Sequence, residues 1–414
     1  MAPALTLPLR NSVYRRLFSA QIVGLLGTGI STVALGLLAF SMGGGNAGQI
    51  LGVVLALKVA TYVLVSPAIA AFAAGVSRKK LLVTMDVVRA LAIGSIAFVG
   101  EIWQVYVLIV IVSAASAGFT PAFQALIPDI FTDVDTYTEA LSLSRLAYEL
   151  EALVSPLIAG LLLAVVGYTE LFTLNSLAFL TSAGLVLTTA VPAVRDDALA
   201  ARKLSQVSQG IRQFLRTPRL QGLFLLDWAA AAAGAMVLIN TVIYVKGQLG
   251  FGDSDVAWAL GAFGAGSIVI ALLLPTLLRR FTDRSLMLLG GLILAASMFL
   301  FVAVGSLTTL MACWALAGIG TSAVLTPSGR LIQRSGDSAG RPALFAAQFS
   351  LSHFCWLFTY LIAGFAGEAL GLSEVALILG AIAAGASVLA AMVWRPEPPA
   401  RQASSTGSPQ RLSR

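Results

Sequence analysis

Charged residues are scarce in this sequence. Aspartate, glutamate, lysine and arginine account for 11% of its 414 residues, whereas a water-soluble domain carries roughly 25% because its surface must be solvated. Hydrophobic residues account for 58%. A chain of this composition must face lipid over most of its surface. We therefore expect an all-α membrane protein, whose helices satisfy their own backbone hydrogen bonds.

Cysteine and histidine are also rare. The two cysteines, Cys313 and Cys355, lie in apolar segments and have neither metal-ligand spacing nor the pattern of a disulfide framework. His353 is the single histidine. The sequence lacks a phosphate-binding loop and a nucleophile motif as well. We therefore expect no enzyme activity, no metal centre, no cofactor and no use of ATP by this chain.

Twelve apolar segments have the roughly 20 residues that a membrane-spanning helix needs. The first is too long to be the core of a cleaved signal peptide. The predicted helices are 13–42, 48–74, 80–100, 102–127, 137–166, 168–192, 219–247, 255–279, 284–304, 307–332, 341–369 and 373–394. They predict an N-terminal six-helix bundle (1–192), a polar linker (193–218), a C-terminal six-helix bundle (219–394) and a disordered tail (395–414).

Basic residues gather in the loops on one side of the predicted membrane. These are Arg10, Arg15, Arg16, Arg78, Lys79, Lys80, the linker cluster, Arg279, Arg280, Arg284, Arg334, Arg341 and the tail arginines. The opposite loops carry acidic residues, with Lys246 as the exception. Positively charged loops stay in the cytoplasm. We therefore expect both termini and the linker to be cytoplasmic, in a bacterial inner membrane. We also expect the protein to be a monomer surrounded by membrane lipids. The net charge of +7 follows from this topology and does not indicate a nucleic-acid partner.

The two halves resemble each other at an offset close to 205 residues. Residues 155–160 (SPLIAG) match residues 359–364 (TYLIAG), and Thr120-Pro121 matches Thr326-Pro327. The repeat also aligns Gln21 with Asp227. Two related six-helix halves joined by a cytoplasmic loop predict a transporter with its site at the interface between them.

With these features the chain resembles the major facilitator superfamily, over nearly its whole length. Residues 70–90 (AAFAAGVSRKKLLVTMDVVRA) are similar to the family's signature between helices 2 and 3, in the version of the drug, macrolide and siderophore exporters. Residues 153–160 (LVSPLIAG) are similar to the antiporter signature of helix 5, and residues 140–156 resemble more loosely the nickel and cobalt resistance exporters. The resemblance implies a twelve-helix efflux antiporter that works by alternating access.

The resemblance also implies a gating role for the loop signature. The residues that fit it are Arg78, Lys79, Lys80, Asp86 and Arg89. Ala74 and Gly75 stand where the family has an acidic residue and its basic neighbour. Because that acid helps to latch the cytoplasmic gate in the family, the departure puts the same latch in doubt here.

Ionisable residues at membrane depth are costly and mark functional sites. Arg145 and Glu149 lie four residues apart on one helix face, so they predict either a proton or cation site or a structural ion pair. Glu151 lies on a different face. His353, which the repeat places opposite Glu149, is either a titrating group or a packing residue. The candidate substrate- and proton-binding residues are Glu149, Asp227, His353, Arg145, Gln21, Lys58 and Glu151.

Lys58 bears on the charge of the substrate, because it repels a cation unless it is paired and attracts an anion. The main hypothesis is a secondary-active exporter, coupled to the proton gradient, for a small amphiphilic or siderophore-like molecule. The alternative is a divalent-metal exporter for nickel or cobalt with the same fold, against which the lack of paired histidines and the charge of Lys58 count. A lipid flippase-like carrier or a sensor is a third class, which the short linker and tail disfavour.

Overall fold

The computed structural model describes residues 7–72, 77–131, 133–190, 209–335 and 341–396. The first half contains α1 (Ser12–Gly43), α2 (Ala47–Phe72), α3 (Arg78–Ile96), α4 (Ile102–Ile130), α5 (Val134–Leu163) and α6 (Tyr168–Leu187). The second half contains α8 (Pro218–Ala235) with π-helical continuations η4 (Met236–Asn240) and η5 (Ile243–Gln248), α9 (Asp253–Arg280), α10 (Asp283–Phe301), α11 (Leu307–Leu325), α12 (Ser328–Gln333), α13 (Arg341–Leu370) and α14 (Leu372–Val393).

These helices give six spans in each half. In the second half, α8 with its π-helical turns forms one span, and α11 with the short α12 forms another. Within the described ranges the chain has no β-strand. The prediction of an all-α protein with twelve helices is confirmed.

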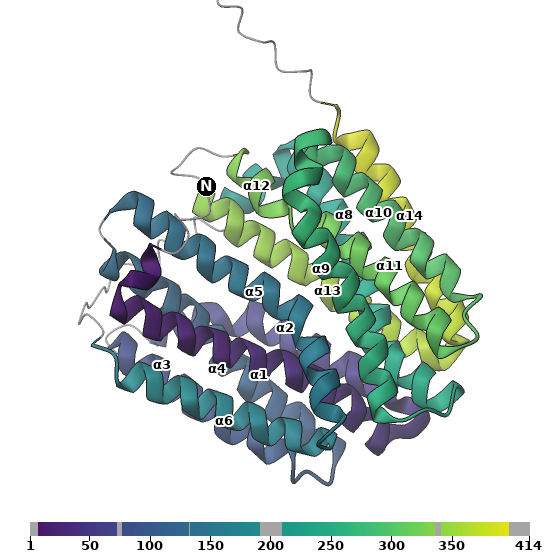
Figure 1. The fold of residues 1–414 in the computed structure, drawn as a ribbon, viewed down its shortest axis with the longest axis horizontal. Coiled ribbons are helices and arrows are strands. Elements are labelled where there is room, and N and C mark those ends of the chain that lie inside the picture. Colours follow the sequence, from purple (N-terminus) through teal and green to yellow (C-terminus); the bar gives the residue numbers. More distant parts are fainter. Residues whose placement is uncertain (1–6, 73–76, 132, 191–208, 336–340, 397–414) are drawn as a thin grey trace, which may run out of the picture.

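The two halves have the same internal packing. In the first half, α1 packs on α5 and α6, α3 packs on α4 and α6, and α2 packs on α4. The corresponding pairs in the second half are α8 with α13 and α14, α10 with α11 and α14, and α9 with α11. Figure 1 shows α3 and α6 at one outer edge of the molecule and α10 and α14 at the opposite edge. The weak sequence repeat therefore corresponds to a structural repeat.

Short polar side chains fix several helix starts. Asn11 accepts hydrogen bonds from the backbone of Val13 and Tyr14, and Asp133 and Ser306 cap α5 and α11 in the same way. These caps satisfy backbone N–H groups that have no partner within the helix. Gly371, with φ of +105°, makes the tight connection between α13 and α14. The short loops keep successive helices antiparallel.

The apolar helices have the length and composition for a membrane. Nine stretches of the described residues qualify as spans, and the first of them runs through α1 into α2. α3 and α5, which carry many of the charged residues, are not among them. Leu91, Leu272 and Met392 are strongly exposed on α3, α9 and α14, as expected for helix side chains that contact lipid.

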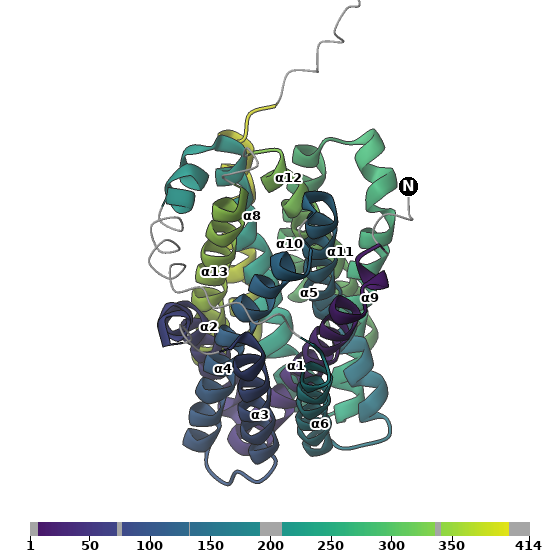
Figure 2. The same ribbon diagram turned by 90° about the vertical axis from the view of Figure 1, so that its left-hand side faces the viewer.

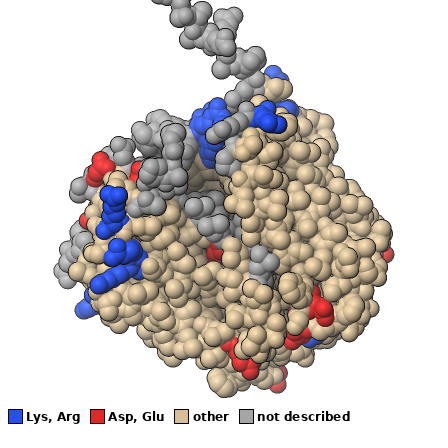
Figure 3. Space-filling model, viewed as in Figure 1, with Lys and Arg blue, Asp and Glu red and all other residues tan. Residues whose placement is uncertain are grey.

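Charge divides the molecule into two ends. We call the end with Arg16, Arg78, Arg284 and Arg334 the basic end, and the end with Glu101, Glu170, Asp255 and Glu374 the acidic end. Figure 3 shows Lys and Arg side chains mainly along the upper left and top of the molecule, and a group of Asp and Glu side chains at the lower right. The sequence predicts this separation of charge.

Much of the predicted linker and tail lies outside the described residues, which exclude 191–208 and 397–414. The end of the linker, residues 209–216, is helical and buries Phe214. The boundaries assigned to the linker and the tail therefore remain predictions.

Candidate functional site

Four helices form the boundary between the halves. α2 packs against α13, and α5 packs against α9; Figure 2 shows α13 directly above α2. A Cβ atom on Gly52 would lie 2.9 Å from the carbonyl oxygen of Tyr360, and one on Gly160 would lie 3.3 Å from that of Ala257. Small residues permit such close packing of membrane helices. Both contacts lie toward the acidic end, so the halves are closed against each other there.

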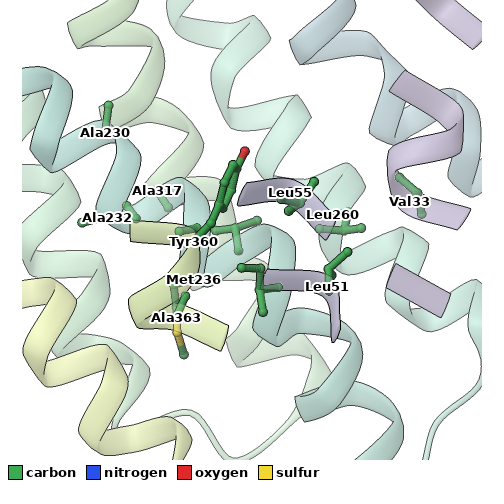
Figure 4. Packing of buried hydrophobic residues seen from close by; sticks show 14 of the residues in the cluster. Val33, Leu51, Leu55, Ala230, Ala232, Met236, Leu260, Ala317, Tyr360 and Ala363 are labelled. Carbon is green, nitrogen blue, oxygen red and sulfur yellow. The ribbon is translucent and has the colours of Figure 1, made fainter. Parts of the chain in front are cut away.

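An apolar layer lies inside this closed end. Val33, Leu51, Leu55, Met236, Leu260 and Tyr360 are buried together and come from both halves. Figure 4 shows the ring of Tyr360 near Leu55 at the centre of this layer. A polar solute meets a high barrier in such a layer because its hydrogen bonds to water have no replacement. In this conformation the layer blocks passage toward the acidic end.

Lys58 and Tyr62 continue the same face of α2 toward the basic end. Residues 51, 55, 58 and 62 have the spacing of one helix face. Lys58 therefore lies about one turn beyond the apolar layer. Tyr62 forms a side-chain hydrogen bond with Ser116 of α4. The α2 face thus changes from apolar to polar near the middle of the membrane.

Glu151 on α5 is the electrostatic partner of Lys58. Their opposite charges interact through space. Both side chains are surrounded by protein, yet both remain partly accessible, which is the combination expected of residues that line an internal cavity. Lys58 and Glu151 therefore lie inside the protein, near the middle of the predicted membrane.

α1 holds the Glu151 carboxylate in place. A Cβ atom on Gly29 would collide with Oε1 of Glu151 and with the side chain of Ser155. Gly29 is therefore required for α5 to pack so closely on α1. Glu151 reaches its position because Gly29 has no side chain.

His353 approaches the site from the second half. Its ring centroid lies 6.4 Å from that of Tyr62 and 3.9 Å from that of Phe349. Its Nδ1 lies 2.7 Å from the backbone oxygen of Phe349. His353 and Tyr62 therefore bring the halves together near the level of Lys58.

Gln21 and Asp227 occupy equivalent places, as the sequence repeat indicates. Gln21 is hydrogen-bonded to Ser144 of α5 at 2.8 Å, and Asp227 accepts a hydrogen bond from Gln348 of α13 at 2.8 Å. Gln21 and Asp227 are each 2% exposed, so they fasten helices within each half. Both hydrogen-bond partners are absent from the predicted site. The sequence repeat could have identified both partners, because Gln348 lies 204 residues after Ser144.

The side chains of Arg145 and Glu149 lie outside the described residues, although the backbone places both in α5. Their predicted pairing therefore remains a prediction. Among the side chains that the structure does describe, no three His, Cys, Asp or Glu come together as a metal site. The described side chains therefore do not support the alternative of a nickel or cobalt exporter.

A family model described as transmembrane secretion effector matches residues 4–335. The chain belongs to this family of major facilitator transporters. It is 24% identical over 221 residues to the uncharacterized MFS-type transporter YfiS of Bacillus subtilis (strain 168), an alignment that covers 52% of each protein. The chain thus spans about half the length of this curated relative. The family consists of transporters, so the expectation that the chain is not an enzyme is confirmed.

Solved structures share the fold of this chain. One is an inward-facing bacterial homologue of the human lysosomal transporter Spinster, with a TM-score of 0.71, 16% identity, and coverage of 95% of this chain and 99% of that one. Another is the nucleoside transporter NupG, with a TM-score of 0.70, 13% identity, and coverage of 94% of this chain and 100% of that one. Its D323A mutant also has a TM-score of 0.70, with 12% identity and coverage of 93% and 100%. At these identities the likeness shows the fold alone.

The predicted gating residues of this transporter fall into two groups. At the basic end, Arg78 forms an ion pair with Asp129 at the end of α4, and Lys79 donates to the backbone oxygen of Thr189. Lys80 is exposed. These contacts fasten the start of α3 to its neighbours. Residues 73–76, where the acidic residue of the family signature is replaced, lie outside the described residues.

Asp86 and Arg89 lie inside α3, away from the loop. They form an ion pair, and Ser182 of α6 donates to Asp86 at 2.7 Å. The Arg89 guanidinium is sandwiched between the rings of Phe119 and Phe179, at 4.1 and 4.4 Å from their centroids. Such cation–π contacts and the ion pair together compensate the burial of this charge. This cluster ties α3 to α4 and α6 inside the first half.

The second half has an ion pair that the sequence reading missed. Asp283 at the start of α10 pairs with Arg334, and Arg330 lies 3.6 Å from the same carboxyl group. At the acidic end, Lys246 pairs with Asp253 and lies 5.2 Å from the ring centroid of Phe40. The latter pair neutralises the basic residue that stood out in the predicted topology.

Proposed function

We propose that this transporter is a proton-coupled exporter of a small amphiphilic or siderophore-like molecule. In this proposal it resides as a monomer in the bacterial inner membrane, with both termini in the cytoplasm, and works by alternating access. It uses the proton gradient and no cofactor. The family description as a secretion effector supports the outward direction.

The observation that carries the proposal is the Lys58–Glu151 pair. Opposite charges on α2 and α5 interact there through space, and Lys58 follows the apolar layer on the same face of α2. Ionisable groups at this depth are retained for substrate binding or proton transfer. A carboxylate whose charge is balanced by a nearby amine changes its interactions strongly when either group gains or loses a proton.

The conformation supports loading from the cytoplasm. Positively charged loops face the cytoplasm, so the basic end is the cytoplasmic end in this proposal. The glycine contacts at Gly52 and Gly160 close the opposite end. In alternating access, one half rocks against the other around a central site. The described state would then accept substrate from inside the cell.

The proposal is tested with purified protein in liposomes carrying an imposed pH gradient. Movement of ethidium, as an amphiphilic probe, is followed by fluorescence beside a ferric hydroxamate as a siderophore probe. We expect one of them to move against the proton gradient, and the Glu151→Gln variant to lose this coupling. Glu149→Gln and Asp227→Asn serve as comparison variants. Probe flux through the unmodified protein that does not depend on the pH gradient would reject proton coupling. Movement of the probe in the same direction as protons would reject export.

A further inference from the structure

Lys58 has a setting that the export function does not by itself explain. A positive charge at a transport site repels cations and attracts anions. Yet Lys58 lies within electrostatic range of Glu151, whose opposite charge favours the charged form of the amine. The pair leaves a substrate two routes, since an anion can replace Glu151 as the partner of Lys58, or a cation can replace Lys58 as the partner of Glu151.

The two routes couple to protons in opposite ways. An anion bound at Lys58 displaces the negative charge of Glu151, which then favours the protonated carboxyl group. Anion and proton would travel together. A cation bound at Glu151 leaves Lys58 next to a second positive charge, which favours the neutral amine. The cation and the proton would then move in opposite directions, as export driven by an inward proton gradient requires.

We propose that the substrate is an organic cation with an apolar body, and that Lys58 carries the exchanged proton. This inference rests on the proposed export function. The cation takes the place of the Lys58 ammonium beside the Glu151 carboxylate, and the ammonium loses its proton to water and becomes a neutral amine. The charge of the site is the same before and after the exchange. When the cation leaves on the far side, Lys58 takes up a proton there and pairs with Glu151 again.

The other titratable groups around the pair do not replace Lys58 in this role. Tyr62 on α2 is hydrogen-bonded to Ser116, and Arg89 on α3 is paired with Asp86. His353 on α13 contacts the backbone oxygen of Phe349 through Nδ1. Asp227 on α8 is bonded to Gln348, while Arg145 and Glu149 on α5 have side chains outside the described residues. Among the side chains that the structure describes, Lys58 is the amine whose charge acts on Glu151.

The surroundings of the pair fit an apolar cation. The rings of Tyr62, His353 and Phe349 follow one another from α2 to α13, and the apolar layer with Leu55 and Tyr360 lies on the other side. Aromatic faces attract organic cations. The carboxylate would hold the charge while the rings and the layer contact the body of the molecule.

Two probe ions of the same shape and opposite charge test the inference. Tetraphenylphosphonium and tetraphenylborate are titrated separately into the detergent-purified protein in weakly buffered solution, and binding and proton release are measured together. We expect tetraphenylphosphonium to bind with release of about one proton per ion, as linkage requires. Tighter binding of tetraphenylborate, proton uptake, or binding of neither ion would overturn the inference.

Substitutions of Lys58 separate its role in proton exchange from a structural role. Arginine keeps the charge but cannot release a proton, so Lys58→Arg should lose proton release and bind tetraphenylphosphonium about tenfold or more weakly. Lys58→Met should also lose proton release but should retain or improve binding. Lys79→Met at the basic end is the matched control. Equal losses of binding in both Lys58 variants would contradict the inference. This equilibrium binding assay does not depend on export. A failure of vesicle transport alone would therefore refute the proposed function without contradicting the inference about cation binding and Lys58.

Discussion

Asp283 and Arg334 form an ion pair of 2.8 Å at the basic end of the second half. The first half has the same bridge with its charges exchanged, because Arg78 pairs there with Asp129. Asp283 lies 205 residues after Arg78, and Arg334 lies 205 residues after Asp129. Each bridge joins the start of the third helix of its half to the end of the fourth. The fold therefore requires opposite charges at these two places, whichever residue carries each sign.

Exchanging the charges of the first bridge should therefore be tolerated. Arg78→Asp alone places two carboxylates together and should lower thermal stability, by an amount between the ~1 kcal/mol of an exposed pair and the ~3–5 kcal/mol of a buried one. Adding Asp129→Arg should restore most of it. Thermal unfolding in detergent measures the difference. In the second half, Arg334→Ala should lower thermal stability less than Asp129→Ala does in the first, because Arg330 still lies 3.6 Å from Asp283. A double variant no more stable than Arg78→Asp would contradict the finding.

Hydropathy and the positive charge of the loops predict the twelve helices and their two ends, because membrane insertion depends on local composition. The repeat aligned Gln21 with Asp227 and could also have supplied Ser144 and Gln348. The partnership of Lys58 with Glu151 could not be predicted in this way. These residues are 93 positions apart on α2 and α5, and neither periodicity nor the repeat indicates which faces of two helices meet across a cavity.

The placement of Glu151 depends on Gly29, which gives a second prediction. Gly29→Ala would push α1 away from Glu151 and Ser155, and overpacking of this kind costs ~1–3 kcal/mol. We expect proton-coupled transport to fall more than stability does, because the carboxylate moves. Gly24→Ala on the same helix is the control, since its Cβ would lie an ordinary 3.7 Å from the ring of Phe179. Equal effects of the two substitutions on transport would count against the positioning role of Gly29.

The glycine contact at the acidic end gives a third prediction, for the conformational equilibrium. A Cβ atom on Gly52 would meet the backbone of Tyr360 and Gly364 at 2.9 and 3.1 Å. Gly52→Ala should therefore disfavour the state that is closed at this end and shift the population toward the opposite state. Spin labels at Asn46 and Gln248, which are exposed at the acidic ends of the two halves, should move apart. Gly184→Ala, with no atom within 4 Å of the added Cβ, should leave the label distance unchanged.

The equivalent hydrogen bonds of Gln21 and Asp227 differ in charge, and this difference gives a fourth prediction. Gln348 donates to a carboxylate, whereas Ser144 is bonded to the neutral amide of Gln21. Bonds to a charged group contribute about 1.5–3 kcal/mol, and neutral ones about 0.5–1.5 kcal/mol. Gln348→Leu should therefore lower the unfolding temperature in detergent more than Ser144→Ala does.

Asp227→Asn separates this structural role from a role in proton transfer. The asparagine carboxamide oxygen can still accept from Gln348, so we expect a small loss of stability and unchanged proton coupling in liposomes. Glu151→Gln should differ from it by losing proton coupling in liposomes. Loss of coupling in Asp227→Asn would instead make Asp227 a second proton site. The distinction follows from geometry, because Asp227 is buried between α8 and α13, whereas Glu151 keeps access to the cavity.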